Sequence, residues 1–92
     1  MSSELPPLNG LRSFVEAGRE LSFSRAADRL GVTPGAVSRL VRKLEQHLGV
    51  CLLERAAHGL VLTAQGELYL RDVLGPLTAI EAATQAMCSG VV

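Results

Sequence analysis

The side chains with the most evident chemistry lie on one face of a predicted helix over residues 34–48. That face is cationic and rich in hydrogen-bond donors, and it consists of Gly35, Ser38, Arg39, Arg42, Lys43 and Gln46. The opposite face is an apolar stripe with helical spacing, made of Val37, Leu40, Val41, Leu44 and Leu48. Guanidinium groups pair with phosphates and with guanine edges, so the polar face suits a nucleic acid. An ordinary solvated face has the same composition, and this helix alone does not decide between the two.

Patterns typical of catalysis or metal binding are missing from the sequence. There is no GxSxG, no HExxH and no glycine-rich phosphate loop. The nearest approach to a metal cluster is His47, Cys51 and His58, but Gly49 is expected to end a helix between the first two. Cys51 and Cys88 form no CxxC pair and are expected to be free thiols. We therefore expect that the protein is not an enzyme and that it binds no metal ion and no cofactor.

Composition predicts one small folded domain, since the 92 residues are 48% hydrophobic and 20% charged. No apolar run is long enough to span a membrane, and the first residues lack the features of a signal peptide, so the expected compartment is the cytoplasm. Nine basic residues balance nine acidic ones. Residues 25–55, however, carry six Lys or Arg and three Asp or Glu, so a basic segment lies between acidic flanks.

Three helices are predicted in the first half of the chain. The first covers about residues 10–21 and is capped by Asn9, and the second is capped by Ser22 or Ser24 and ends at Gly31. Thr33 followed by Pro34 starts the third. Residues 23–42 have the pattern of a helix-turn-helix, with Ala27 at the helix crossing, Gly31 in the turn, and apolar anchors at Ala26, Leu30, Val32, Val37 and Leu40. A helix pair without a binding role would have a similar pattern.

A hairpin and a long helix are predicted to follow. The apolar runs 50–53 and 60–62 flank a polar connection over 54–59, which predicts two strands and a candidate wing. Thr63 caps the last helix, in which Pro76 is expected to introduce a kink. Apolar positions in steps of three and four predict a dimer interface at Leu70, Val73, Leu77, Ile80, Thr84 and Met87. Residues 89–92 are expected to fray.

Three segments resemble the amino-terminal DNA-binding domain of LysR-type transcriptional regulators in order and spacing. They are SFSRAADRLGVTPGAVSR, LEQHLGVCLLER and LTAQG, within a resemblance that covers residues 5 to about 87 and is most similar to the glycine-cleavage-activator subgroup. The resemblance implies a mainly α fold: a winged helix-turn-helix over residues 6–63, with a three-helix core and a β-hairpin wing, followed by a linker and dimerisation helix over 64–88.

The same resemblance implies partners. A homodimer would form through antiparallel pairing of the linker helix and would bind a two-fold related operator in double-stranded DNA. Family members continue into an effector-binding domain, which we expect this chain to lack. A small-molecule effector would then act only through that missing domain. The alternative from another class is a winged-helix module whose third helix meets an acidic protein partner.

The resemblance, carried over position by position, also implies DNA-binding residues. Those at the start of the third helix are expected to face the bases, with Arg39 as the best candidate for reading guanine: Thr33, Pro34, Gly35, Ala36, Ser38 and Arg39. Those expected mainly at phosphates are Ser22, Ser24, Arg42 and Lys43. Arg25 is also expected to bind DNA.

The wing is expected to contribute Arg55 and His58. Arg55 would either contact the DNA backbone or pair with Glu54 or Glu45, and the sequence leaves both open. His58 stands where many relatives have arginine, and Pro34 where many have glutamine. Specificity is therefore expected to depend more on Arg39 and on DNA shape, with a weaker contribution from the wing.

Overall fold

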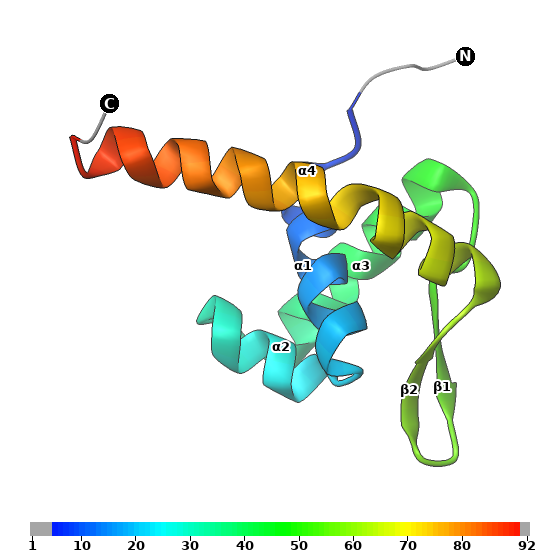
Figure 1. Ribbon diagram of the computed structural model, residues 1–92. Helices are drawn as coiled ribbons and strands as arrows, with labels where there is room; N and C mark the ends of the chain where they lie inside the picture. Colours follow the sequence, from blue (N-terminus) through cyan, green and yellow to red (C-terminus); the bar gives the residue numbers. More distant parts are fainter. Residues whose placement is uncertain (1–4, 91–92) are drawn as a thin grey trace.

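The computed structural model describes residues 5–90, and within them four helices and one hairpin follow one another along the chain. In order these are α1 (Leu8–Glu20), α2 (Phe23–Leu30), α3 (Pro34–Leu48), β1 (Leu53–Ala56), β2 (Gly59–Leu62) and α4 (Ala64–Cys88). Figure 1 shows α1, α2 and α3 grouped together, the hairpin projecting beside them, and α4 running across the group. The fold is mainly α and is a winged helix-turn-helix followed by a long helix, as the sequence predicted.

Hydroxyl side chains determine where three of these helices begin. Each accepts a hydrogen bond from the backbone N–H three residues later, at 2.9 to 3.1 Å, and the three are Ser22, Thr33 and Thr63. Ser22 rather than Ser24 is therefore the cap of α2. Gly31 and Gly49 end α2 and α3 with φ values of 70° and 76°, a conformation that glycine adopts without steric cost. These boundaries confirm the sequence prediction.

The predicted start of α1 is wrong by two residues. Asn9 lies inside the helix, and the residue at the cap is Pro7, which makes no side-chain capping bond. The Pro7 carbonyl accepts a hydrogen bond from the Leu11 N–H at 2.9 Å, as a cap carbonyl should. Leu21 ends α1 with a φ of 52°, so a leucine here takes the left-handed conformation that usually favours glycine.

The predicted first strand is also misplaced. β1 begins at Leu53, pairs antiparallel with β2, and leaves a short turn at Ala57 and His58. The apolar residues before it connect α3 to the hairpin, and there the Glu45 carboxylate accepts hydrogen bonds from the N–H groups of Leu52 and Leu53 at 2.8 and 3.2 Å. Leu52 is fully buried, so the apolar run reflects core packing rather than a strand.

The core lies where α1 crosses α3. Its largest fully buried side chains are Phe14, Val37, Leu44 and Leu52. A Cβ at Gly10 would stand 2.9 Å from the Leu40 carbonyl oxygen, so the two helices need glycine at this crossing. Ala26, Ala27 and Val37 are buried and Leu30 and Leu40 half-buried, but Val32 is 46% exposed, which corrects its prediction as an anchor of the helix-turn-helix.

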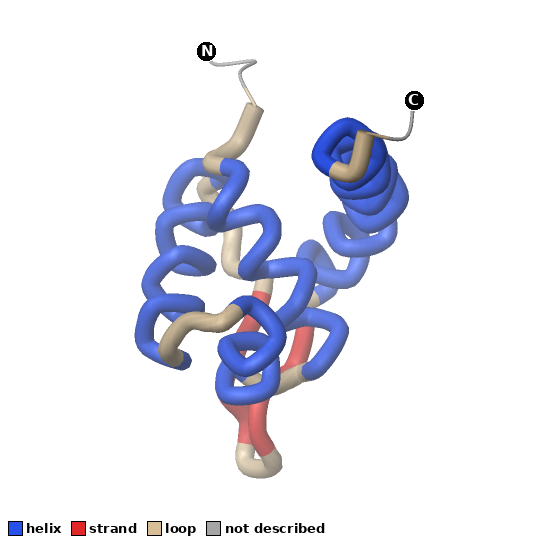
Figure 2. Tube along the Cα trace, turned by 90° about the vertical axis from the view of Figure 1, so that its left-hand side faces the viewer, coloured by secondary structure: helices blue, strands red, loops and turns tan. Residues whose placement is uncertain are grey.

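The two halves of α4 have different surroundings. Leu77 is buried and Leu70 and Val73 are half-buried against the core, whereas most of the side chains beyond Leu77 are exposed. Figure 2, which looks nearly along α4, shows the helix beside the other three rather than among them. The helix runs through Pro76 without interruption. Of the tail predicted to fray, Ser89 and Gly90 continue directly from α4, and residues 91–92 lie outside the described part of the chain.

Candidate nucleic-acid interface

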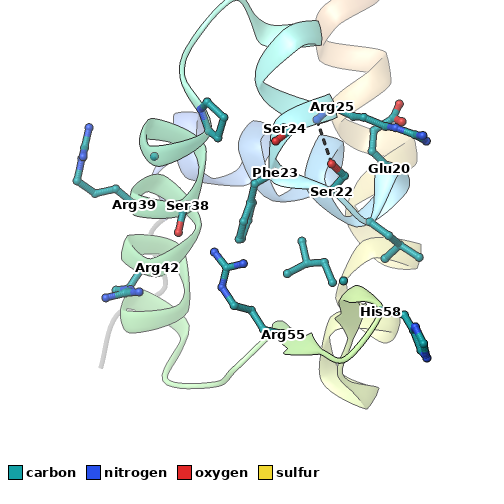
Figure 3. A pocket seen from close by; sticks show the side chains of 15 residues that line it. Glu20, Ser22, Phe23, Ser24, Arg25, Ser38, Arg39, Arg42, Arg55 and His58 are labelled. Atoms are coloured by element: carbon teal, nitrogen blue, oxygen red, sulfur yellow. Dashed lines mark hydrogen bonds between the residues drawn. The ribbon is translucent and has the colours of Figure 1, made fainter.

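An open groove of about 910 Å³ lies between α2, α3 and the hairpin (Figure 3). Among the described residues that line it are four arginines, Arg25, Arg39, Arg42 and Arg55, and one carboxylate, Glu20. The Glu20 carboxylate is 2.6 Å from the Arg29 guanidinium, which lies outside the groove. That bond and the nearby charge raise the pKa of Arg29 further above its ordinary value. Because four arginines line the groove and its one carboxylate is paired with Arg29, the groove is cationic.

Ten of the predicted DNA-binding residues line this groove: Ser22, Ser24, Arg25, Pro34, Gly35, Ser38, Arg39, Arg42, Arg55 and His58. Thr33, Ala36 and Lys43 do not line it. Thr33 and Lys43 are exposed, and Ala36 is half-buried in the first turn of α3. Five lining residues were not predicted: Glu20, Leu21, Phe23, Gly59 and Leu60.

The two faces of α3 are divided as the sequence predicted. Val37, Val41 and Leu44 are buried, and the polar face is exposed at Gly35, Arg39, Arg42, Lys43 and Gln46. Ser38 is half-buried and points into the groove in Figure 3, whereas Arg39 and Arg42 extend outward from α3. Together these side chains could reach a ligand that lies across the mouth of the groove.

The amino-terminal end of α3 has an open surface at Gly35. A Cβ built there would meet no atom within 4 Å, so no packing within the protein requires glycine at this position. Thr33 and Pro34 beside it are exposed. The end of α3 therefore permits the close approach of another molecule.

Arg55 extends from β1 toward Phe23, the first residue of α2. Its guanidinium carbon lies 5.5 Å from the centroid of the Phe23 ring, within the range of a cation–π contact. Within residues 5–90 no ion pair joins Arg55 to Glu54 or Glu45, and the Glu45 carboxylate instead accepts backbone hydrogen bonds. Sequence reasoning missed Phe23, and its only local signal was an aromatic residue immediately after the cap of α2.

Metal binding and nucleophilic catalysis each require a particular grouping of side chains. No group of three His, Cys, Asp or Glu side chains able to hold a metal ion occurs in residues 5–90. The Cys51 thiol lies 3.2 Å from the Leu53 carbonyl oxygen, and desolvation, with smaller effects of Glu45 and Glu54, raises its pKa. A raised pKa lowers the thiolate fraction and so disfavours nucleophilic chemistry. Over the same residues, no helix combines the length and apolar character needed to cross a bilayer.

The sequence matches a family model and curated proteins. Residues 8–67 match the family described as bacterial regulatory helix-turn-helix protein, lysR family. The chain is 44% identical over 87 residues to the glycine cleavage system transcriptional activator of Escherichia coli K12, covering 95% of this chain and 28% of that protein. It is 52% identical over 75 residues to the HTH-type transcriptional regulator TrpI of Pseudomonas aeruginosa, covering 82% and 25%. The chain thus spans less than a third of these relatives.

Solved structures share the fold over nearly the whole chain. A Corynebacterium glutamicum OxyR C206S mutant is 30% identical with a TM-score of 0.86, covering 97% of this chain and 28% of that one. The BenM DBD in complex with catB site 1 DNA is 30% identical with a TM-score of 0.79, covering 90% and 92%. The CbnR DBD–DNA complex is 29% identical with a TM-score of 0.76, covering 94% and 99%.

Proposed function

This chain belongs to the LysR family of bacterial regulatory helix-turn-helix proteins, and from that membership we propose that it binds double-stranded DNA sequence-specifically as part of a transcriptional regulator. The observation that carries the proposal is the cationic groove in which α2, α3 and the hairpin present four arginines together. The similar structures of the BenM and CbnR DBDs in complex with DNA support it. We expect the protein to regulate transcription in the cytoplasm rather than to act as an enzyme.

Base recognition is assigned to the start of α3, which enters the major groove. Arg39 is exposed, and its guanidinium can pair bidentately with O6 and N7 of guanine. Thr33, Pro34, Gly35, Ala36 and Ser38 would lie against neighbouring base edges. Pro34 has no donor for a base, so the remaining specificity comes from DNA shape.

Phosphate contacts are assigned to residues of α2, α3 and the wing that flank the proposed base-reading residues. The Ser22 oxygen already accepts a bond from the Arg25 N–H, so its hydroxyl hydrogen is available for a phosphate beside the amino-terminal end of α2. Ser24 and Arg25 lie exposed in the same turn, and Arg42 and Lys43 lie along α3. Arg55 and His58 would contact DNA from the wing.

Residues 6–63 form the proposed DNA-binding domain, and residues 64–88 form the linker helix through which two copies pair. Leu70, Val73 and Leu77 are partly or fully covered by their own domain, whereas Ile80 is 56% and Met87 68% exposed. Thr84 is exposed between them. The proposed interface therefore centres on the second half of α4. A two-fold pair would place two α3 helices on two half-sites.

Salt dependence separates DNA binding from the alternative of a winged-helix module for protein interaction. Binding to duplex DNA, measured by fluorescence anisotropy, should weaken by about 0.9 log unit per phosphate contact for each tenfold rise in salt. Arg42→Ala should reduce the steepness of that salt dependence by about 0.9, the value of one phosphate contact. Arg71→Ala on α4 is the matched control, because Arg71 is exposed outside the groove, and it should leave the slope unchanged. Absence of DNA binding at about 50 mM salt would favour the alternative.

A further inference from the structure

We propose that Phe23 is a positioning residue for DNA binding, which holds the Arg55 guanidinium of the wing beside α3 before DNA arrives. The inference rests on the proposed function, because it assigns a part in that binding to a residue that does not itself contact DNA. We call the Phe23–Arg55 contact the clasp. It joins the first residue of α2 to β1, two elements far apart in the sequence (Figure 3).

The Phe23 end of the clasp is fixed in place. Phe23 is half-buried, packs against the core, and follows directly on the Ser22 cap whose hydrogen bond begins α2. Its ring therefore has a defined position relative to α3. A cation held against this ring is held at a fixed place in the groove.

The Arg55 end belongs to a part of the wing that has few other restraints. The base of the hairpin is anchored by buried Leu53 and by the two hydrogen bonds to Glu45. Beyond Leu53 every residue up to Gly59 is exposed, and Leu60, the partner of Arg55 in the strand register, is buried. The side chain of Arg55 thus extends from an exposed strand edge, where an arginine ordinarily samples several rotamers.

The positive charge of Arg42 makes the Phe23 ring more important for holding Arg55 in the crevice. Arg42 and Arg55 line the same crevice of about 260 Å³, together with Phe23, Ser38 and Glu45. Arg42 repels Arg55 in this crevice, and the Glu45 carboxylate, which accepts hydrogen bonds from the N–H groups of Leu52 and Leu53, attracts it. The negative face of the aromatic ring attracts the guanidinium and offsets that repulsion.

The clasp leaves Arg55 able to bind a phosphate. The guanidinium has five N–H donors, and those that do not face the Phe23 ring remain available to a phosphate. Ordering the side chain in the free protein also lowers the entropy lost when DNA binds. Removal of the ring should therefore weaken binding through Arg55 and not through the base-reading residues.

A double-mutant cycle tests this inference on a duplex that the protein binds. Phe23→Leu should weaken binding roughly twofold to fivefold, the range expected for an exposed cation–π contact. Phe23→Tyr keeps the ring and should bind like the wild type. In the Arg55→Gln background, Phe23→Leu should have no further effect, because the group it positions is gone. Phe23→Leu should also reduce the salt slope toward that of Arg55→Gln, by up to about 0.9.

Two controls keep the test decisive. In the Arg39→Ala background, Phe23→Leu should retain its full effect, since the clasp does not involve Arg39. In the free protein, NMR should find the Arg55 side-chain protons shifted upfield by the ring current, and Phe23→Leu should abolish that shift. Thermal unfolding followed by circular dichroism establishes that each variant is folded.

Each other outcome overturns the inference. An equal effect of Phe23→Leu with and without Arg55 would mean that Phe23 acts only through core packing. Tighter binding by Phe23→Leu would mean that the ring withholds Arg55 from DNA. In both cases the wild type still binds DNA and the proposed function stands, whereas failure of the wild type to bind any duplex at low salt overturns the function and the clasp together.

Discussion

At the scale of single residues, Gly35 is the position where the needs of DNA binding and of packing within the protein differ most clearly. The position lines the groove at the start of α3, and a side chain there would meet no other part of the protein within 4 Å. Glycine is the poorest helix former apart from proline, so the fold gains nothing from it. We expect that its role, under the proposed function, is to permit the close approach of DNA to this end of α3.

Gly35→Ala should therefore change stability and DNA binding in opposite directions. The free energy of unfolding should rise by up to about 1 kcal/mol because alanine favours the helix. Affinity for an operator duplex should fall, because the methyl group occupies space that a base edge would take. Denaturant unfolding and fluorescence anisotropy measure the two effects. Wild-type affinity in the variant would show that DNA does not approach Gly35 closely.

Residue-scale prediction from the sequence succeeded where the signal is local. The caps at Ser22 and Thr33 and the polar face of α3 follow from the order of a few neighbouring residues. The contact between Phe23 and Arg55 does not, because it joins residues that only the fold brings together. For the same reason, the sequence does not decide whether Arg55 pairs with Glu45. In the structure, the Glu45 carboxylate accepts hydrogen bonds from the backbone of Leu52 and Leu53 instead.

At the scale of elements, the junction of the hairpin with α4 sets the position of the wing. Thr63 donates its backbone N–H to the Leu52 carbonyl at 2.9 Å, and its hydroxyl bonds the Cys51 carbonyl at 2.6 Å while capping α4. A Cβ at Gly66 would clash with the Leu52 carbonyl oxygen. The first turn of α4 is therefore pressed against the segment that precedes β1.

Gly66→Ala should lower the free energy of unfolding by about 1 to 3 kcal/mol, because the backbone at Leu52 must move to admit the methyl group. Gly35→Ala is the control, because its Cβ would meet nothing within 4 Å and no proline follows it. The control should not destabilise the protein. Chemical denaturation compares the two, and equal stabilities would contradict the close contact at Gly66.

The elements that the sequence placed least well are those whose boundaries depend on tertiary packing. The run Val50 to Leu53 has strand-like composition, yet Leu52 fills the core and the strand begins only at Leu53. The predicted start of α1 is wrong because Asn9 is a favourable cap in isolation, whereas Pro7 already permits the helix to begin.

At the scale of the whole molecule, α4 leaves apolar surface exposed beyond the domain. Its second half runs past the three-helix group in Figure 1, and in the described chain its contacts there include the Arg12–Glu81 ion pair at 3.7 Å. Exposed surface pairs of this kind contribute little stability. We therefore expect that apolar positions such as Ile80 and Met87 are covered by a second copy of the helix in the proposed dimer.

Ile80→Glu should convert the proposed dimer into a monomer without unfolding it, because Ile80 is 56% exposed in the single chain. Leu77 is unsuitable for this test, since it is buried in its own domain. Thr78→Glu is the matched control, placed on α4 away from Ile80 and exposed. Light scattering should give the mass of one chain for Ile80→Glu and of two for the control. A dimeric Ile80→Glu would contradict this interface.

The most direct test of sequence-specific DNA binding is selection of bound duplexes from a random library. The wild type should enrich one motif made of two related half-sites in two-fold symmetry. Arg39→Ala should lose preference for a guanine in each half-site while still binding DNA. Recovery of duplexes with no enriched sequence, from a folded protein that binds DNA, would contradict sequence-specific recognition by α3.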